Sequence, residues 1–110
     1  MKKIINTNKS PAPIGPYNQA ILKDNMLFIS GQIALDPVSM KLNNETIEEE
    51  TNQVMLNLKH ILNEAKMDFS NVVKTSIFLS DMDLFKDVND IYGKYVCLLY
   101  TSDAADDLLC

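Results

Sequence analysis

Two glycine-centred segments in the first third of the chain contain the residues best suited to binding a small molecule. One runs from Ile14 to Ala20 and reads IGPYNQA, and the other runs from Phe28 to Ile33 and reads FISGQI. Gly31 has no side chain, so a ligand oxygen can approach its backbone N–H closely. A β-bulge or a bend in a sheet also explains a glycine at this place, and the pattern by itself favours that explanation.

Three other polar residues are candidates for the same site. Tyr17 follows Gly-Pro and can present its phenol to a cleft, although a tyrosine that begins a strand more often packs in the core. Asn89 falls at the edge of a helical stripe, where an amide either reaches inward or is solvated. Ser30 is not expected to be an activated nucleophile, because the flanking glycines of a nucleophile elbow are missing.

Metal chemistry finds little support in the sequence. His60 is the only histidine, and it lies off the apolar stripe of its predicted helix. No second His, Cys or carboxylate cluster stands at ligand spacing, so His60 is predicted to be a solvated surface residue and no metal site is expected. Cys97 and Cys110 both fall within residues 97–110, which indicates neither a disulfide framework nor a thiolate site.

Composition and charge narrow the function classes. The chain has 110 residues and a net charge of −5, and it contains no arginine. Its lysines are scattered, whereas phosphate binding needs a clustered basic patch, so no nucleic-acid partner is expected. No apolar run approaches the ~20 residues that span a bilayer, and the N-terminal segment lacks a signal-like stretch. The sequence therefore predicts a single cytoplasmic domain with no membrane partner.

A rigid loop and a hairpin are predicted to hold the glycine-centred segments. Residues 9–16 contain three of the four prolines, so this stretch should be irregular and unable to form a continuous ladder. Strand-like runs cover residues 17–23 and 26–30. The Asp24-Asn25 pair between them tolerates the positive φ of a tight turn, which predicts a β-hairpin.

The rest of the chain alternates helical and strand patterns. A capping box from Thr46 to Glu49 and an apolar stripe predict a helix over residues 47–66. Alternating β-branched residues predict a strand over 72–79 with one buried face. A second helix should begin near Asp81 or Asp83. The order of strand, β-hairpin, helix, strand and helix predicts an α+β fold, a mixed sheet with helices packed on one face.

Taken together, the motifs resemble those of the Rid family of reactive intermediate deaminases, formerly called YjgF. The resemblance runs from about residue 3 to Val96. It is carried by Gly15-Pro16-Tyr17, Ser30-Gly31-Gln32-Ile33, Asp36-Pro37, Asn57-Leu58-Lys59, Val73-Lys74-Thr75 and Phe85 to Asn89. Met40 and Lys66 stand where the family commonly has turn-forming glycines.

The resemblance implies a chorismate-mutase-like fold and a homotrimer with sites between subunits. It also implies hydrolysis of 2-imino acids, 2-iminobutanoate and 2-iminopropanoate, to 2-keto acids and ammonia without a cofactor. By position, Tyr17 would line the pocket, Ser30 and Gly31 would contact the substrate through hydroxyl and backbone, and Asn89 would support the wall. Because a protonated imine is already electrophilic, the protein need only orient it and a water.

The sequence departs from the family pattern after residue 96. Family members continue to a Pro-Ala-Arg segment, whose arginine holds the substrate carboxylate, and to a glutamate that helps position the attacking water; neither is present here. Residues 1–96 are therefore predicted to be a Rid-like domain without its C-terminal strands. Residues 97–110 are predicted to be an out-of-frame or adapter-derived tail, with a genuine divergent ending as the alternative.

These departures leave the activity of the 110-residue chain open. It is expected to be impaired in catalysis and assembly, because lysine does not reproduce the bidentate contact of arginine. A non-catalytic ligand-binding protein is one alternative. A ribonuclease or translation inhibitor, as some family members have been described, is another, and the acidic charge and lack of arginine argue against it.

Overall fold

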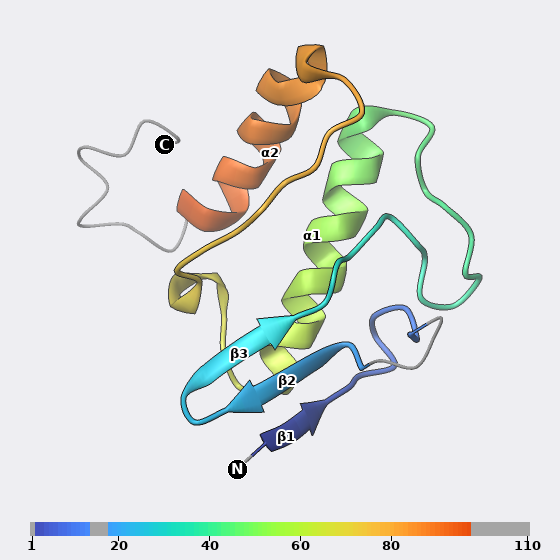
Figure 1. Ribbon diagram of the computed structural model, residues 1–110. Coiled ribbons are helices and arrows are strands. Elements are labelled where there is room, and N and C mark those ends of the chain that lie inside the picture. Colours follow the sequence, from blue (N-terminus) through green and yellow to red (C-terminus); the bar gives the residue numbers. More distant parts are fainter. Residues whose placement is uncertain (1, 14–17, 98–110) are drawn as a thin grey trace.

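The computed structural model describes residues 2–13 and 18–97, which form one sheet and two main helices (Figure 1). The sheet is antiparallel, in the order β1-β2-β3, and α1 covers one of its faces while α2 packs beside α1. The α+β class is confirmed, although the described sheet is antiparallel throughout and not mixed. The elements are β1 (Lys2–Ile5), β2 (Ala20–Lys23), β3 (Met26–Ile29), α1 (Ile47–Glu64) and α2 (Phe85–Cys97).

The predicted hairpin turn forms at Asp24-Asn25. Asp24 has a φ of 55°, and Lys23 pairs with Met26 directly across the turn. The pairing continues from there without a bulge to Ala20 opposite Ile29. Strand alternation then directs one set of side chains toward α1 and the other set away from it.

The core lies between the sheet and α1. Ile61 is fully buried against Ile5 and Ala20, and a second buried cluster contains Met55, Leu62 and Phe69. The apolar stripe of α1 supplies a member of each cluster, as its spacing predicted. The core therefore fixes the position of α1 under the hairpin.

Both ends of α1 have identifiable capping interactions. The Thr46 hydroxyl accepts a hydrogen bond from the Glu49 N–H at 3.0 Å, as predicted, while the reciprocal bond of a full capping box does not form in this described segment. At the other end, the Lys66 N–H donates to the Asn63 carbonyl and the Met67 N–H donates to the Leu62 carbonyl. This is a Schellman motif, whose left-handed position favours glycine.

The two positions at which the resemblance placed glycine do adopt glycine-type backbone. Lys66 has a φ of 62° and Met40 a φ of 58°. Residues with a Cβ are strained in this region. Each is therefore a place where the sequence is suboptimal for the turn that it makes.

The strand predicted over residues 72–79 is wrong for the described structure. This segment has no regular secondary structure, and it joins two short 3-10 helices, η1 (Phe69–Asn71) and η2 (Met82–Leu84). Figure 1 shows it passing along the helices instead of joining the sheet, and Tyr92 of α2 donates to Thr75. A strand needs a neighbouring ladder as well as β-branched residues, and no described strand pairs with this one.

The predicted start of the second helix is confirmed. The Asp81 carboxylate accepts a hydrogen bond from the Asp83 N–H at 2.9 Å and caps η2. The 3-10 turn then leads directly into α2 at Phe85. Val88 and Ile91 are buried, so α2 presents an apolar face to the rest of the fold.

Candidate functional site

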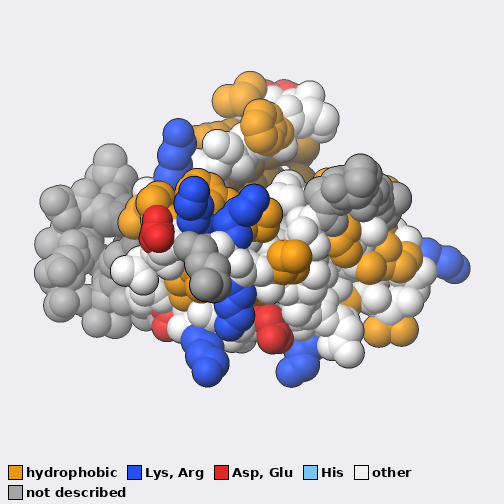
Figure 2. Space-filling model, turned by 60° about the horizontal axis from the view of Figure 1, so that its bottom comes forward, with side chains coloured by type: hydrophobic (Ala, Val, Ile, Leu, Met, Phe, Trp, Pro, Cys, Tyr) orange, Lys and Arg blue, Asp and Glu red, His pale blue; other side chains and the backbone are white. Residues whose placement is uncertain are grey.

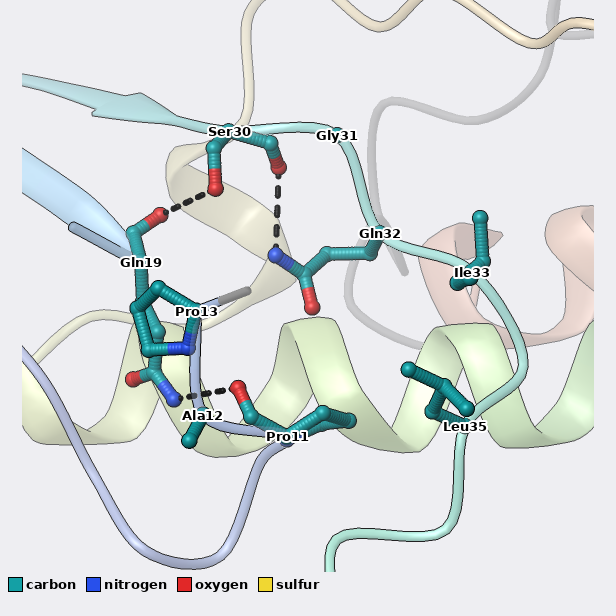
Figure 3. Close-up of a pocket in the computed structure, with 9 residues that line it drawn as sticks. All are labelled: Pro11, Ala12, Pro13, Gln19, Ser30, Gly31, Gln32, Ile33 and Leu35. Atoms are coloured by element: carbon teal, nitrogen blue, oxygen red, sulfur yellow. Dashed lines mark hydrogen bonds between the residues drawn. The ribbon is translucent and has the colours of Figure 1, made fainter. Parts of the chain in front are cut away.

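A hollow of about 170 Å³ lies between the proline-rich loop and the chain that follows β3 (Figure 3). This volume suits a ligand of few non-hydrogen atoms, because drug-sized sites usually occupy about 300–1,000 Å³. None of its described lining residues carries a charge. The lining consists of Pro11, Ala12, Pro13, Gln19, Ser30, Gly31, Gln32, Ile33 and Leu35.

Ser30 stands at the end of β3 with its hydrogen-bond donors already engaged. Its N–H and its hydroxyl both donate to the Gln19 carbonyl, each at 3.0 Å. A hydroxyl has one donor and two acceptor lone pairs. Toward the hollow, the Ser30 oxygen is therefore left with acceptor capacity, which suits a ligand N–H or O–H.

Gly31 offers the complementary group. It is exposed, and a Cβ built on it would meet nothing within 4 Å. Among the described residues no acceptor takes its N–H, and no bulge interrupts the pairing of β2 with β3 that ends beside it. Close approach of a ligand oxygen to this N–H is therefore sterically possible, although the sequence pattern by itself had favoured a bulge or a bend.

Gln32 extends the polar side of the hollow. Its side chain turns back toward Ser30, and the amide nitrogen donates to the Ser30 carbonyl at 3.2 Å (Figure 3). The amide group lies below Ser30 and to the right of Pro13 in this view. This contact leaves the amide oxygen of Gln32 as a further acceptor beside the hollow.

Gln19 holds the proline-rich loop against the hairpin. Its buried carboxamide nitrogen lies 2.9 Å from the Thr7 carbonyl, 3.2 Å from that of Ser10 and 2.8 Å from that of Pro11. Its carboxamide oxygen accepts from the Thr7 N–H at 2.7 Å. Because the Gln19 carbonyl also holds Ser30, one residue links the loop to the end of β3.

His60 is less exposed than the sequence predicted. Its ring is half-buried, and Nδ1 lies 2.9 Å from the Lys9 carbonyl. Since a carbonyl only accepts, Nδ1 carries the hydrogen in this contact. His60 therefore stays at the surface, as predicted, and has a role that the sequence did not indicate: it helps to hold the proline-rich loop on α1.

Charged groups lie outside the hollow. The nearest in sequence, Asp36, is in the turn after Leu35, where the backbone N–H groups of Ser39 and Val38 donate to its carboxylate. These bonds hold the pKa of the Asp36 carboxyl below its usual value of 3.8. Within residues 2–13 and 18–97, no three His, Cys, Asp or Glu side chains are placed to share a metal ion.

The structure brings together two of the four predicted site residues. Ser30 and Gly31 line the hollow side by side, whereas Tyr17 lies outside the described residues. Asn89 is half-buried on α2 and does not line the hollow, so its role stays a prediction. A second hollow, of about 190 Å³ between α1, residues 75–80 and α2, is lined mostly by apolar side chains and contains none of the four.

Sequence reasoning missed three amide residues around the hollow. Gln19 and Gln32 lie inside the two glycine-centred segments, and this position could have identified them as candidate site residues. Asn57 is fully buried on α1 and donates to the carbonyls of the chain after β3. Asn57 could have been found because it stands between apolar positions of the predicted helix, and an amide that is buried there requires hydrogen-bond partners.

Comparison with known proteins identifies the family. The model of the family described as Endoribonuclease L-PSP matches residues 7–104. The chain belongs to this family. The match ends past residue 96, so the domain boundary proposed there stays a prediction.

Individual relatives bear out the Rid resemblance. It is 52% identical over 94 residues to the RutC family protein slr0709 of Synechocystis, covering 84% of this chain and 72% of that protein. It is 48% identical over 95 residues to the 2-iminobutanoate/2-iminopropanoate deaminase of Mus musculus, covering 86% and 70%. The solved Rid family protein YyfA of Yersinia pestis is 39% identical with a TM-score of 0.84, covering 86% and 75%.

Proposed function

We propose that this chain binds small 2-imino acids in the hollow and promotes their hydrolysis to 2-keto acids and ammonia. The observation that carries the proposal is the pairing of an acceptor, the Ser30 hydroxyl, with an open donor, the Gly31 N–H, in a small uncharged hollow. Support also comes from relatives named 2-iminobutanoate/2-iminopropanoate deaminase, which are 44% and 48% identical over most of this chain.

The reaction needs orientation more than it needs a reactive side chain. Water adds to the carbon of the protonated imine and gives a tetrahedral carbinolamine. One proton moves from oxygen to nitrogen, the C–N bond breaks as the carbonyl forms, and the remaining hydroxyl proton passes to the departing ammonia, which leaves as ammonium. The substrate already carries the positive charge that makes its carbon electrophilic, so holding it and a water in line supplies much of the rate gain.

The two groups in the hollow match the two ends of such a substrate. The iminium N–H can donate to the Ser30 oxygen, and a carboxylate oxygen can accept from the Gly31 N–H. Hydrogen bonds to charged groups are worth about 1.5–3 kcal/mol each. Tyr17 as a further lining residue and Asn89 as a support for the wall complete the proposed site.

We propose that the working assembly is a homotrimer whose sites lie between subunits. The sheet face turned away from α1 supports this, because Ile4, Met26 and Phe28 on it are each more than half exposed. Figure 2, which brings the bottom of the molecule forward, shows hydrophobic side chains at the surface in patches among lysines. Light scattering on the wild type and on Phe28→Asp tests this: the wild type, although its assembly is expected to be impaired, should contain a species with the mass of three chains, and the variant should have the mass of one.

We also place the protein in the cytoplasm. Neither α1 nor α2, the two main helices of the described part, is long and apolar enough to cross a membrane. The small 2-imino acids proposed as substrates arise from enamines released by pyridoxal-phosphate-dependent dehydratases. Fractionation of source cells, with detection of this chain, tests the placement.

Binding without turnover is the alternative that one observation favours. The sequence contains no arginine, the residue best suited to bidentate contact with a carboxylate. A chain of this kind would bind 2-keto or 2-imino acids and leave them unchanged. RNA cleavage, the activity in the family's description, gains no support from a described lining without any cationic side chain.

The deciding experiment couples the chain to a threonine dehydratase and measures the release of ammonia. The wild type, although impaired by the missing arginine, should still accelerate release above the dehydratase alone, and Gly31→Ala should lower its kcat/KM about ten- to a hundredfold, because the added methyl group crowds the N–H. The melting temperature should stay unchanged, since that Cβ has open space. The control is Ser76→Ala, which lies beside the second hollow and should not change the rate.

The outcomes of this experiment distinguish a deaminase from a binding protein and from a ribonuclease. No acceleration above the dehydratase alone, with 2-oxobutanoate still bound, would favour binding without turnover. Cleavage of a single-stranded RNA by the wild type, lost in Gly31→Ala, would instead support the ribonuclease reading. Equal rates for the wild type and Gly31→Ala would contradict the assignment of Gly31 to the site.

A further inference from the structure

The middle of α1 meets both walls of the hollow at one residue, Asn57, which is 0% exposed. Its carboxamide donates to the Ile33 carbonyl at 3.2 Å and to the Leu35 carbonyl at 3.0 Å, on the wall that follows β3. Its backbone carbonyl accepts from the Ser10 hydroxyl at 2.6 Å, at the start of the proline wall. Both walls are therefore tied to the same point of the helix.

The carboxamide of Asn57 has a single satisfied orientation. Its oxygen accepts from the Gln53 side chain at 3.0 Å, and its nitrogen faces two carbonyls, which can only accept. Turning the amide over would place oxygen against oxygen at the wall and nitrogen against nitrogen at Gln53. A buried amide with every partner in place resists such rotation, so it is a rigid spacer.

The proline wall has further contacts with the hairpin and with α1. Gln19 holds the carbonyls of Ser10 and Pro11, and His60 holds that of Lys9. Ser10 is 2% exposed, so its hydroxyl has no water to replace Asn57 as a partner. Movement of this wall away from α1 therefore requires both the Ser10 contact with Asn57 and the His60 contact with Lys9 to break.

We propose that Asn57 is a positioning residue that sets the width of the hollow and thereby the size of the 2-imino acid that fits. The identity of the ligand in this proposal rests on the proposed function. Asn57 does not line the hollow, and it acts through the two walls that it holds. Releasing either wall should widen the hollow and weaken its preference for the smallest side chains.

The test uses two variants that release the walls separately. Ser10→Ala removes the hydroxyl that ties the proline wall and adds no bulk. Asn57→Asp removes the amide donor that ties the Ile33 and Leu35 carbonyls, while its backbone carbonyl still accepts from Ser10. The control is Asn63→Asp, the same substitution at an exposed position of α1.

The measured quantity is the ratio of kcat/KM for 2-iminopropanoate to that for 2-imino-4-methylpentanoate, which has a larger side chain. This ratio does not depend on the fraction of folded protein, so a purely structural defect would not change it. It should fall about fivefold or more in Ser10→Ala and in Asn57→Asp and stay unchanged in Asn63→Asp. An unchanged ratio in Ser10→Ala would overturn the proposal, even if Asn57→Asp failed to fold.

A binding measurement separates this proposal from the proposed function. Pyruvate and 4-methyl-2-oxopentanoate are stable keto acids with the same two side chains, and their dissociation constants can be measured by NMR titration. If the wild type shows no turnover but the ratio of the two constants shifts in Ser10→Ala, the positioning role stands and the deaminase proposal fails. A wild type that binds neither keto acid would overturn both.

Discussion

The hollow beside β3 and the segment from residue 72 to 79 are held in place by different means. Around the hollow, buried amides and hydroxyls from three parts of the chain are paired, and no described buried side-chain polar atom lacks a partner. The later segment has the Tyr92 to Thr75 contact, and Val73 and Phe78 are more than nine-tenths exposed. Polar contacts thus fix the first region, while apolar groups of the second remain in water.

The difference reflects where each region finds its partners. Gln19 holds residues 7–11 and Ser30, all within a dozen positions of it in the sequence, and Asn57 and His60 of α1 reach from further away. Contacts at short sequence separation form at low cost in chain entropy. A strand at residues 72–79 would need a ladder from another strand, and none of the described strands supplies it.

The largest expected effect is at Gln19. Gln19→Met keeps the size of the side chain but leaves the carbonyls of Thr7, Ser10 and Pro11 without their donor. The free energy of unfolding should fall by about 3 kcal/mol. Urea titration measures it, and Gln53→Met, whose bonds go only to other side chains, should cost about 1 kcal/mol. Equal losses in the two variants would mean that the hollow is not held in the way described.

A smaller effect, of opposite sign, is expected where α1 ends. Lys66→Gly removes the Cβ strain of a left-handed residue and should raise the stability by about 1 kcal/mol. Lys59→Gly, within the same helix, should lower it by about 1 kcal/mol. Urea unfolding measures both changes, as shifts of the unfolding midpoint with an unchanged dependence of the unfolding free energy on urea concentration. A destabilised Lys66→Gly would show that the lysine side chain has a stabilising contact in solution.

In the later segment, a large chemical change should have little effect. Phe78→Ser removes an aromatic ring that is 94% exposed, so the stability should stay within about 0.5 kcal/mol of the wild type. Thermal and urea unfolding of the two proteins measure the difference. A loss above about 1.5 kcal/mol would mean that Phe78 is covered in solution, and the contrast between the two regions would then disappear.

The smallest effect concerns acid. The folded-state pKa of Asp36 lies below its unfolded value of 3.8, so its contribution is present above that pH and is lost as the pH falls through the folded value. Asp36→Asn should remove this step from the curve of stability against pH. The measurement is the unfolding free energy of both proteins as the pH is lowered from neutral through 3.8. Parallel curves for the two proteins would show that the turn contacts of Asp36 do not contribute to the free energy of unfolding.

Local chemistry in the sequence predicted much of the fold. Asp24-Asn25 makes the hairpin turn, Thr46 begins α1 and Asp81 caps the turn before α2. Each signal depends on backbone geometry within a few residues, so it holds whatever the rest of the chain does. The resemblance likewise marked Met40 and Lys66 as glycine-type positions, and both have positive φ.

The sequence by itself determined the hairpin turn and the helix ends, because each of these depends on residues close together in the chain. Its motifs, spread from about residue 3 to Val96, also determined the family and the α+β class, while the roles of Ser30 and Gly31 stay a prediction. Only the tertiary structure decided that Gln19 and Asn57 hold the hollow, that Asn89 does not line it, and that residues 72–79 run along the helices. These outcomes depend on which carbonyls or strands lie opposite a side chain after folding. A buried amide requires hydrogen-bond partners, and a run of β-branched residues requires a neighbouring strand. The packing of the whole chain determines whether either is available.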